Sequence, residues 1–158
     1  MPKQKPYDWT QFTLRIVIKA APEKIFKAWT DDKIITKWFP IKAQIEPKKN
    51  GRIYMEWVAG DKLDAKVREV VKNQKFVFDF GNQGERVSVK IKRDGKVSIL
   101  ELKQFNMQTT PKMKVGMHMG CKQGWTFFMA NLKGFLEHGI DLRSPDPKRC
   151  YKQDFINS

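Results

Sequence analysis

The sequence has little of the chemistry that most metal proteins need. Its 158 residues contain only two cysteines, Cys121 and Cys150, and two histidines, His118 and His138. The cysteines do not have the spacing of a metal-binding motif, and a disulfide between them is not expected in a reducing compartment. The histidines lie twenty residues apart, which is about 30 Å along a helix that rises about 1.5 Å per residue. We therefore expect no metal site and no cofactor.

Recognisable catalytic motifs are also missing. The sequence has no HExxH, no nucleophile elbow, no P-loop and no GxGxxG, and these are the motifs that mark common hydrolase and nucleotide sites. Acid–base catalysis needs a carboxyl group inside a cleft. Glu56, Asp79 and Glu101 are expected to face away from the apolar side of their strands, Glu69 stands alone and Asp64 is ambiguous. With no inward pair of carboxylates, the sequence does not support an enzyme.

Long apolar runs are absent as well. No run of eighteen apolar residues occurs, and the N-terminal stretch MPKQKPYDWTQF has no apolar core of a signal peptide. We therefore expect no membrane-spanning helix and a cytoplasmic location. Apolar residues still make up 41% of the chain, with five tryptophans and eleven phenylalanines. This content predicts one packed domain over 1–158, with its core at about 10–143 and a polar tail at 144–158.

Positive charge exceeds negative charge, with 31 basic and 17 acidic residues and a net charge of +14. The excess is spread evenly, because residues 1–80 and residues 81–158 each carry a net charge of +7. Many lysines alternate with apolar residues, as on the solvated face of a sheet. A specific nucleic-acid partner is therefore not expected from this basic protein, and the sequence leaves open whether the charge serves another partner.

Apolar periodicity predicts the first three elements. The alternation from Phe12 to Lys19 indicates a strand, and apolar residues at steps of three or four in AAPEKIFKAWTDDKIITKWFP indicate two short helices. Pro22 suits the first turn of one helix, the acidic turn at 30–32 can cap the other, and Pro40 ends it.

From residue 41 onward the period returns to two and predicts six more strands. They lie within IKAQIEP, GRIYMEWVAG, DKLDAKVREVV, KFVFDFG, ERVSVKIKRDG and KVSILELKQFNM. Asn50-Gly51 and Asp94-Gly95 are predicted as tight hairpin turns. Because the connections are short, antiparallel pairing is the simplest topology.

The last predicted element is a long helix. QTTPKMKVGMHMGCKQ is compatible with a loop or with the early turns of this helix. We expect a loop to about Val115, followed by helix to about His138, with Gly139 as a stop signal. Its apolar face comprises Trp125, Phe128, Met129, Leu132, Phe135 and Leu136. A curved sheet must cover this face, so the predicted class is α+β.

Two stretches of the sequence resemble a known superfamily. TLRIVIKAAPEKIFKAWTDDKIITKWFP and GWTFFMANLKGFLEHGIDLR are similar to the ends of START-like (SRPBCC, helix-grip) domains, most of all the branch named after the activator of heat-shock protein 90 ATPase. The resemblance covers about residues 10–143. It implies a curved antiparallel sheet of about seven strands around a long C-terminal helix, with two short helices after the first strand. This superfamily contains lipid carriers, cyclases, hydrolases and co-chaperone domains, so the fold alone does not assign a function.

Such an architecture predicts a cavity between the sheet and the long helix, roofed by the short helices. The residues expected to line it are Trp38, Phe39, Met55, Trp57, Phe78, Phe80, Leu102, Met117, His118, Trp125, Phe128, Met129 and Leu132. The alternative is that these side chains fill the core and that His118 is solvated. Tyr54, Gln104 and His118 are the candidate polar groups of the cavity.

Three functions remain open at this point. The first is binding of a small hydrophobic ligand in the cavity. The second is a co-chaperone-type interaction domain like the activator of heat-shock protein 90 ATPase, and the third is an enzyme of the cyclase or aromatase type. The corresponding partners are a small apolar ligand or a chaperone, and the sequence is compatible with a monomer or a homodimer.

Overall fold

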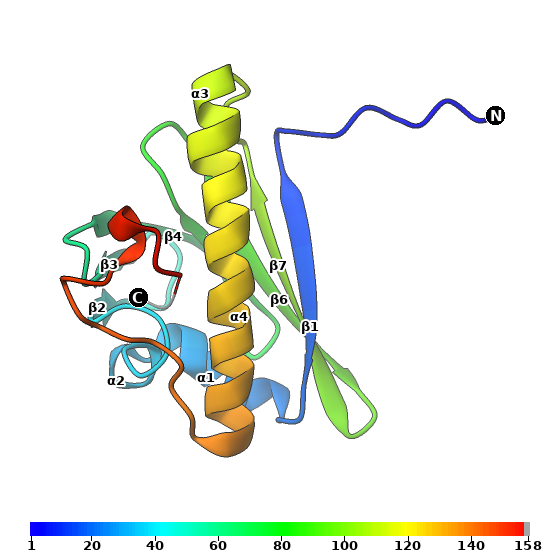
Figure 1. Ribbon diagram of the computed structural model, residues 1–158. Helices are drawn as coiled ribbons and strands as arrows, with labels where there is room; N and C mark the ends of the chain where they lie inside the picture. Colours follow the sequence, from blue (N-terminus) through cyan, green and yellow to red (C-terminus); the bar gives the residue numbers. More distant parts are fainter. Residues whose placement is uncertain (157–158) are drawn as a thin grey trace.

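An antiparallel sheet curves around one long helix (Figure 1). The computed structural model describes residues 1–156. In chain order the elements are β1 (Phe12–Ile18), α1 (Pro22–Thr30), α2 (Asp32–Ile35), β2 (Lys42–Ile45), β3 (Arg52–Glu56), β4 (Lys62–Val71), β5 (Lys75–Asp79), β6 (Arg86–Asp94), β7 (Val97–Phe105), α3 (Pro111–Met113), the π-helix η1 (Lys114–Met119), α4 (Gly120–His138) and the short 3₁₀-helix η2 (Tyr151–Gln153).

The strand order confirms the predicted topology. Within the described residues the seven strands form one sheet in the order β1-β7-β6-β5-β4-β3-β2. Strands β2 to β7 pair with their neighbours in sequence, while β1 joins the far edge beside β7, with Ile16 opposite Leu100. The predicted α+β class, the seven antiparallel strands and the two short helices are therefore confirmed.

The short helices form where the sequence places their signals. Pro22 occupies the first turn of α1, and Oδ1 of Asp31 accepts hydrogen bonds from the backbone N–H of Lys33 and Ile34 at 2.9 and 3.1 Å. The indole Nε1 of Trp38 donates to the carbonyl oxygen of Ala28 at 2.9 Å. This buried bond fixes the chain after α2 against α1.

The start of the long helix differs from the sequence prediction. We expected a loop to about Val115, but helix begins at Pro111 and runs through η1 into α4. Thr110 caps this start, because its Oγ1 accepts from the backbone N–H of Met113 at 3.3 Å. The loop prediction was wrong because the start signal at Thr110 and Pro111 outweighs the single Gly116 within this stretch.

The predicted hairpin turn at Asn50-Gly51 was also wrong. Six residues separate Ile45, where β2 ends, from Arg52, where β3 begins. Asn50 has a φ of 64°, but Gly51 is not among the positive-φ glycines, as a type I′ turn would require. Glycine is needed at position 51 for space, since a Cβ would lie 2.2 Å from the carbonyl oxygen of Glu46. The second turn is tight as predicted but lies one residue later than Asp94-Gly95: Asp94 pairs with Val97, so Gly95 and Lys96 form the turn.

The C-terminal segment returns to the β3–β4 side of the molecule (Figure 1). Lys152 donates from Nζ to the carbonyl oxygen of Ala59 at 2.9 Å, and Cys150 is buried. Cys121 and Cys150 are both free thiols. Within residues 1–156, none of the helices has both the length and the hydropathy that a membrane crossing requires.

Candidate functional site

Aromatic rings fill much of the space between the sheet and α4. Phe39 packs against Trp125 and Phe128 of the helix, with ring centroids 4.9 and 4.7 Å apart. From the sheet side, Trp57 lies 5.2 Å from Phe39, and Phe80 lies 5.2 Å from Trp125. These contacts form a continuous cluster, so most of the expected cavity volume is occupied by side chains.

The thirteen predicted lining residues fall into two groups. Nine are buried: Trp38, Phe39, Met55, Phe78, Leu102, His118, Trp125, Met129 and Leu132. Four are half-buried and pack against the core: Trp57, Phe80, Met117 and Phe128. The structure thus brings twelve of them into the core and its edge. Their role as a ligand-binding lining stays a prediction.

His118 is the residue that lies elsewhere. The expectation of a solvated histidine was wrong, because its side chain is only 1% exposed. Its ring faces the segment before β1, where Nδ1 lies 3.0 Å from the carbonyl oxygen of Trp9 and Nε2 lies 2.8 Å from the hydroxyl of Tyr7. His118 therefore belongs to an outer groove and not to the sheet–helix interior.

The most unusual group of the interior is the carboxyl of Glu85, in the loop between β5 and β6. Glu85 is fully buried. Its Oε2 accepts from the backbone N–H of Gln83 at 2.8 Å, but Oε1 has no hydrogen-bond partner in the described part of the chain. Gly81 makes room for this carboxyl, since a Cβ there would lie 2.3 Å from Oε2, and its φ of +142° suits glycine.

A small polar network links β7 to the helix. The Nε1 of Trp125 donates to Oε1 of Gln104 at 2.9 Å, and Gln104 is fully buried. Met117 accepts two weak hydrogen bonds at its sulfur, from Nε2 of Gln104 at 3.9 Å and from Sγ of Cys121 at 3.3 Å. The network fixes Trp125 in one orientation within the aromatic cluster.

The negative charge of Glu85 contributes to a raised pKa of the Cys121 thiol. Burial is the main cause that raises the pKa of the Cys121 thiol above its ordinary value; the Gln104 amide opposes the rise, and the Glu85 carboxylate adds to it. A thiol with a raised pKa stays protonated near neutral pH and is a poor nucleophile. Cys121 is half-buried at the edge of the core, and its raised pKa is not that of an activated cysteine.

A second buried polar atom of the core lacks a partner. The indole Nε1 of Trp29 has no acceptor within residues 1–156, and the Trp29 ring lies 5.8 Å from that of Trp125. An unpaired buried polar group costs about 1–3 kcal/mol. Among the buried side-chain atoms of residues 1–156, one acceptor, at Glu85, and one donor, at Trp29, are thus unpaired. Such groups mark places where a bound molecule can gain a hydrogen bond.

The sequence analysis did not identify Glu85, although the signal was present. In ERVSVKIK the inward positions Val87, Val89 and Ile91 are two residues apart, and the same alternation places Glu85 inward. Glu85 directly precedes β6, outside the strand carboxylates for which an orientation was predicted. Gln104 was named as a candidate polar group, and the structure buries it.

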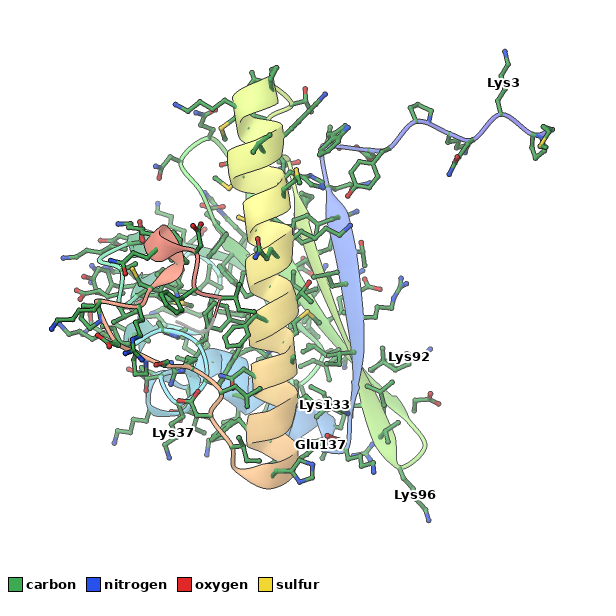
Figure 2. All side chains as sticks on the ribbon, viewed as in Figure 1. Lys3, Lys37, Lys92, Lys96, Lys133 and Glu137 are labelled. Carbon is green, nitrogen blue, oxygen red and sulfur yellow. The ribbon has the colours of Figure 1, made fainter. Side chains whose placement is uncertain are left out.

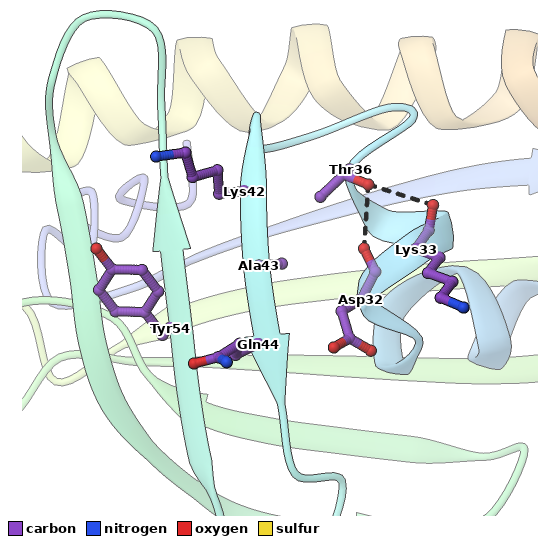
Figure 3. A pocket seen from close by; sticks show the side chains of 7 residues that line it. All are labelled: Asp32, Lys33, Thr36, Lys42, Ala43, Gln44 and Tyr54. Atoms are coloured by element: carbon purple, nitrogen blue, oxygen red, sulfur yellow. Dashed lines mark hydrogen bonds between the residues drawn. The ribbon is translucent and has the colours of Figure 1, made fainter.

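A separate surface groove lies between α2 and the edge strand β2 (Figure 3). Its volume is about 470 Å³, and its lining residues are Asp32, Lys33, Thr36, Lys42, Ala43, Gln44 and Tyr54. Two of its polar side chains already have partners: Thr36 donates to the carbonyl oxygens of Asp32 and Lys33, and Lys42 lies 3.3 Å from Glu56. We regard this groove as solvated surface. Within residues 1–156, no group of three or more metal-ligating side chains could hold a metal ion.

Comparison with known families gives one clear match. Residues 19–137 match the family model described as "Activator of Hsp90 ATPase homolog 1-like protein". A comparison with curated proteins gave no match.

Several solved structures share the fold. The Aha1 dimer from Colwellia psychrerythraea is 26% identical with a TM-score of 0.71, over 82% of this chain and 97% of that one. Protein SSP2350 from Staphylococcus saprophyticus is 18% identical with a TM-score of 0.74, over 85% and 96%. An HSP90 activator from Plasmodium falciparum is 22% identical with a TM-score of 0.67, over 80% and 96%. The last two show similarity of fold alone.

Proposed function

The chain belongs to the family of activator of Hsp90 ATPase homolog 1-like proteins, and from that premise we propose that it binds a small, largely apolar molecule between its sheet and α4. The premise supplies a fold in which a sheet grips a helix. The interior combines aromatic side chains with a few polar groups, and this combination is typical of sites that bind small molecules.

The observation that carries this proposal is the unpaired Oε1 of the buried Glu85 carboxyl. A hydrogen bond to a charged group contributes about 1.5–3 kcal/mol when its donor comes from a bound partner. The favoured ligand therefore has an apolar body and one hydroxyl or amine group that donates to Glu85. An entirely apolar molecule would leave this oxygen unpaired.

Entry of such a ligand requires movement of the aromatic cluster. Trp57, Phe80 and Phe128 are the half-buried rings of the predicted lining, and each contacts another ring of the cluster. We propose that these three rings form the mouth and separate to admit the ligand. Association should then be slower than diffusion, because rings must first leave their packed positions.

The first test is native mass spectrometry of the purified protein before and after denaturation. A small molecule that leaves on denaturation would identify the ligand class directly.

A defined probe pair tests the role of Glu85. The affinities of 4-ethylphenol and ethylbenzene are measured by nuclear magnetic resonance titration on the natural chain, on Glu85→Gln and on the control Glu101→Gln. Glu101 is a suitable control because it lies on β7 and pairs with Arg15 at the surface. We expect the natural chain and the control to prefer the phenol by about tenfold, and Glu85→Gln to lose that preference. No binding of either probe, or an unchanged preference in Glu85→Gln, would reject the proposal.

A second candidate function is interaction with an Hsp90-type chaperone. It is supported by family membership and by the net charge of +14, which favours an acidic partner. The test is to add the chain to the Hsp90-type chaperone of the same organism and to measure ATP hydrolysis and co-sedimentation. Stimulated ATP hydrolysis together with complex formation would support this candidate. Absence of both effects, even at low salt, would reject it.

A further inference from the structure

An outer groove lies where the segment before β1 meets the first turns of the long helix. Its volume is about 470 Å³, and its lining residues are Tyr7, Trp9, His118, Met119, Lys122, Gln123 and Thr126. In Figure 1 the N-terminal segment leaves the body of the protein near this end of the helix, and in Figure 2 Lys3 lies on its far part. Glu85 is not among the lining residues of this groove.

His118 fixes the N-terminal segment in place. A carbonyl oxygen can only accept, so Nδ1 donates to the Trp9 carbonyl, while Nε2 forms a hydrogen bond with the Tyr7 hydroxyl. Lys122 completes the chain by donating from Nζ to the Tyr7 oxygen at 3.1 Å. The rings of Tyr7 and Trp9 meet edge to face, with centroids 4.8 Å apart. Positions 7 to 9 are thus held by specific contacts.

Two lysines place positive charge over these rings. The Nζ of Lys114 lies 5.4 Å from the Trp9 ring centroid, and the Nζ of Lys122 lies 5.4 Å from that of Tyr7. In the chain up to residue 156, no carboxylate lies within ion-pair distance of either lysine. Lys122 uses one of its three N–H groups on Tyr7, so others can donate to a ligand.

Negative charge is missing from the groove itself. None of the lining residues is acidic. The carboxyl of Asp8, between the two aromatic residues, accepts hydrogen bonds from Thr10 and from Gln11. The exposed side chain of Met119 adds an apolar wall. The groove therefore offers aromatic and apolar surface together with Lys122, and Lys114 lies over the ring of the lining residue Trp9.

We propose that this groove is a second binding site, which takes a small molecule with a planar aromatic ring and an anionic group. The ring packs against Tyr7 and Met119, and the carboxylate or phosphate accepts hydrogen bonds from Lys122 and pairs with Lys114. An aromatic carboxylate and a nucleotide share this chemistry, so the experiment must separate them.

The test measures dissociation constants by nuclear magnetic resonance titration of the full chain. Indole-3-acetate and adenosine monophosphate represent the two sources of the anion, and indole-3-acetamide is the neutral match for the first. We expect at least one anion to bind, to shift the amide signals of residues 114–126, and to bind about three- to tenfold more tightly than its neutral counterpart. The anion that binds more tightly identifies the source.

Variants separate this site from the general positive charge of the chain. Lys122→Met and Tyr7→Ala should each weaken anion binding about three- to tenfold. Lys96→Met removes the same charge from the β6–β7 hairpin, at the opposite end of the molecule (Figure 2), and should leave binding unchanged. Glu85→Gln should also leave it unchanged, so the result does not depend on the interior site. Equal effects of Lys122→Met and Lys96→Met, or equal affinity for indole-3-acetate and its amide, would overturn the proposal.

Discussion

The carboxyl of Glu85 and the thiol of Cys121 belong to the same buried polar region, and the charge of the first raises the pKa of the second. Burial is the larger cause of the rise. Glu85 is fully buried and Cys121 is half-buried, so the pKa of the thiol responds both to its own burial and to the nearby carboxylate.

The prediction at this position concerns the reactivity of Cys121. Glu85→Gln removes the negative charge, so the pKa of Cys121 should fall and the thiolate fraction at a given pH should rise. Alkylation by iodoacetamide, followed by mass spectrometry between pH 7 and 10 in a Cys150→Ser background, should become faster. Glu101→Gln should not change the rate. Equal rates in all three chains would show that Glu85 does not face Cys121.

A second prediction concerns Arg143, which ties the segment after α4 to the end of α2. Its guanidinium donates to the carbonyl oxygens of Thr36, Phe39 and Pro40 at 2.9–3.0 Å, and its side chain is 8% exposed. Arg143→Met leaves these carbonyls unpaired and should lower the free energy of unfolding by about 2–4 kcal/mol in urea denaturation. The exposed Arg149→Met is the control and should change it by less than about 0.5 kcal/mol. If Arg143→Met lowered the free energy of unfolding no more than Arg149→Met, Arg143 would not have this stabilising role.

Local sequence signals predicted the apolar face and the end of the long helix, but not its start. Its apolar face and its stop at Gly139 agree with the sequence prediction, while its start at Pro111 does not. The π-helix from Lys114 to Met119 changes the helical phase between the two ends. That change places Met117 toward Gln104 and His118 toward Trp9, so one irregular turn serves both the interior and the outer groove.

Two glycines of this helix give opposite predictions. Gly139 has a φ of 68°, a left-handed conformation in which Ala is strained, so Gly139→Ala should lower the free energy of unfolding by about 1–2 kcal/mol. Gly124 lies inside the helix, where an added Cβ meets no atom within 4 Å, so Gly124→Ala should raise it by about 0.5–1 kcal/mol. Urea denaturation of both variants checks the pair. If both substitutions changed the free energy of unfolding in the same direction, the different roles given to Gly139 and Gly124 would be wrong.

At the scale of the whole molecule, paired carboxylates control the response to acid. Burial opposes ionisation of Asp79, but hydrogen bonds and charge from Arg68 and Arg86 outweigh it and hold its pKa below the ordinary value. In the same way Arg143 and Asn131 outweigh burial at Asp141 and lower its pKa. A carboxyl with a lowered pKa binds its proton more weakly in the folded chain than in the unfolded chain.

Protonation therefore favours unfolding, and the sign of the pH dependence follows. The stabilisation is complete above the ordinary pKa of 3.8 and is lost as the pH falls through the lowered values. We expect the free energy of unfolding, measured in urea, to be nearly constant from pH 7 to about 5 and to fall below about pH 4. Asp79→Asn should be less stable at pH 7 and should show a shallower decline. Equal stability of the natural chain at pH 7 and pH 3 would contradict this account.

The sequence by itself determined the elements and their layers. Alternation with period two located all seven strands, short connections implied antiparallel pairing, and the Trp125–Leu136 face identified the helix that the sheet grips. The stretches from 13 to 40 and from 124 to 143 also indicated the family. These features are local, because side-chain periodicity and turn chemistry depend on residues close together in the chain.

Only the tertiary structure decided which neighbours meet. It brought Tyr7 and His118 together across 111 positions, left Oε1 of Glu85 without a partner among the described residues, and joined the aromatic rings of four separate segments in one cluster. Periodicity tells which face of a strand or helix a side chain occupies. It does not tell whether the space opposite is filled or which polar atom is left over, because these depend on the packing of residues far apart in sequence.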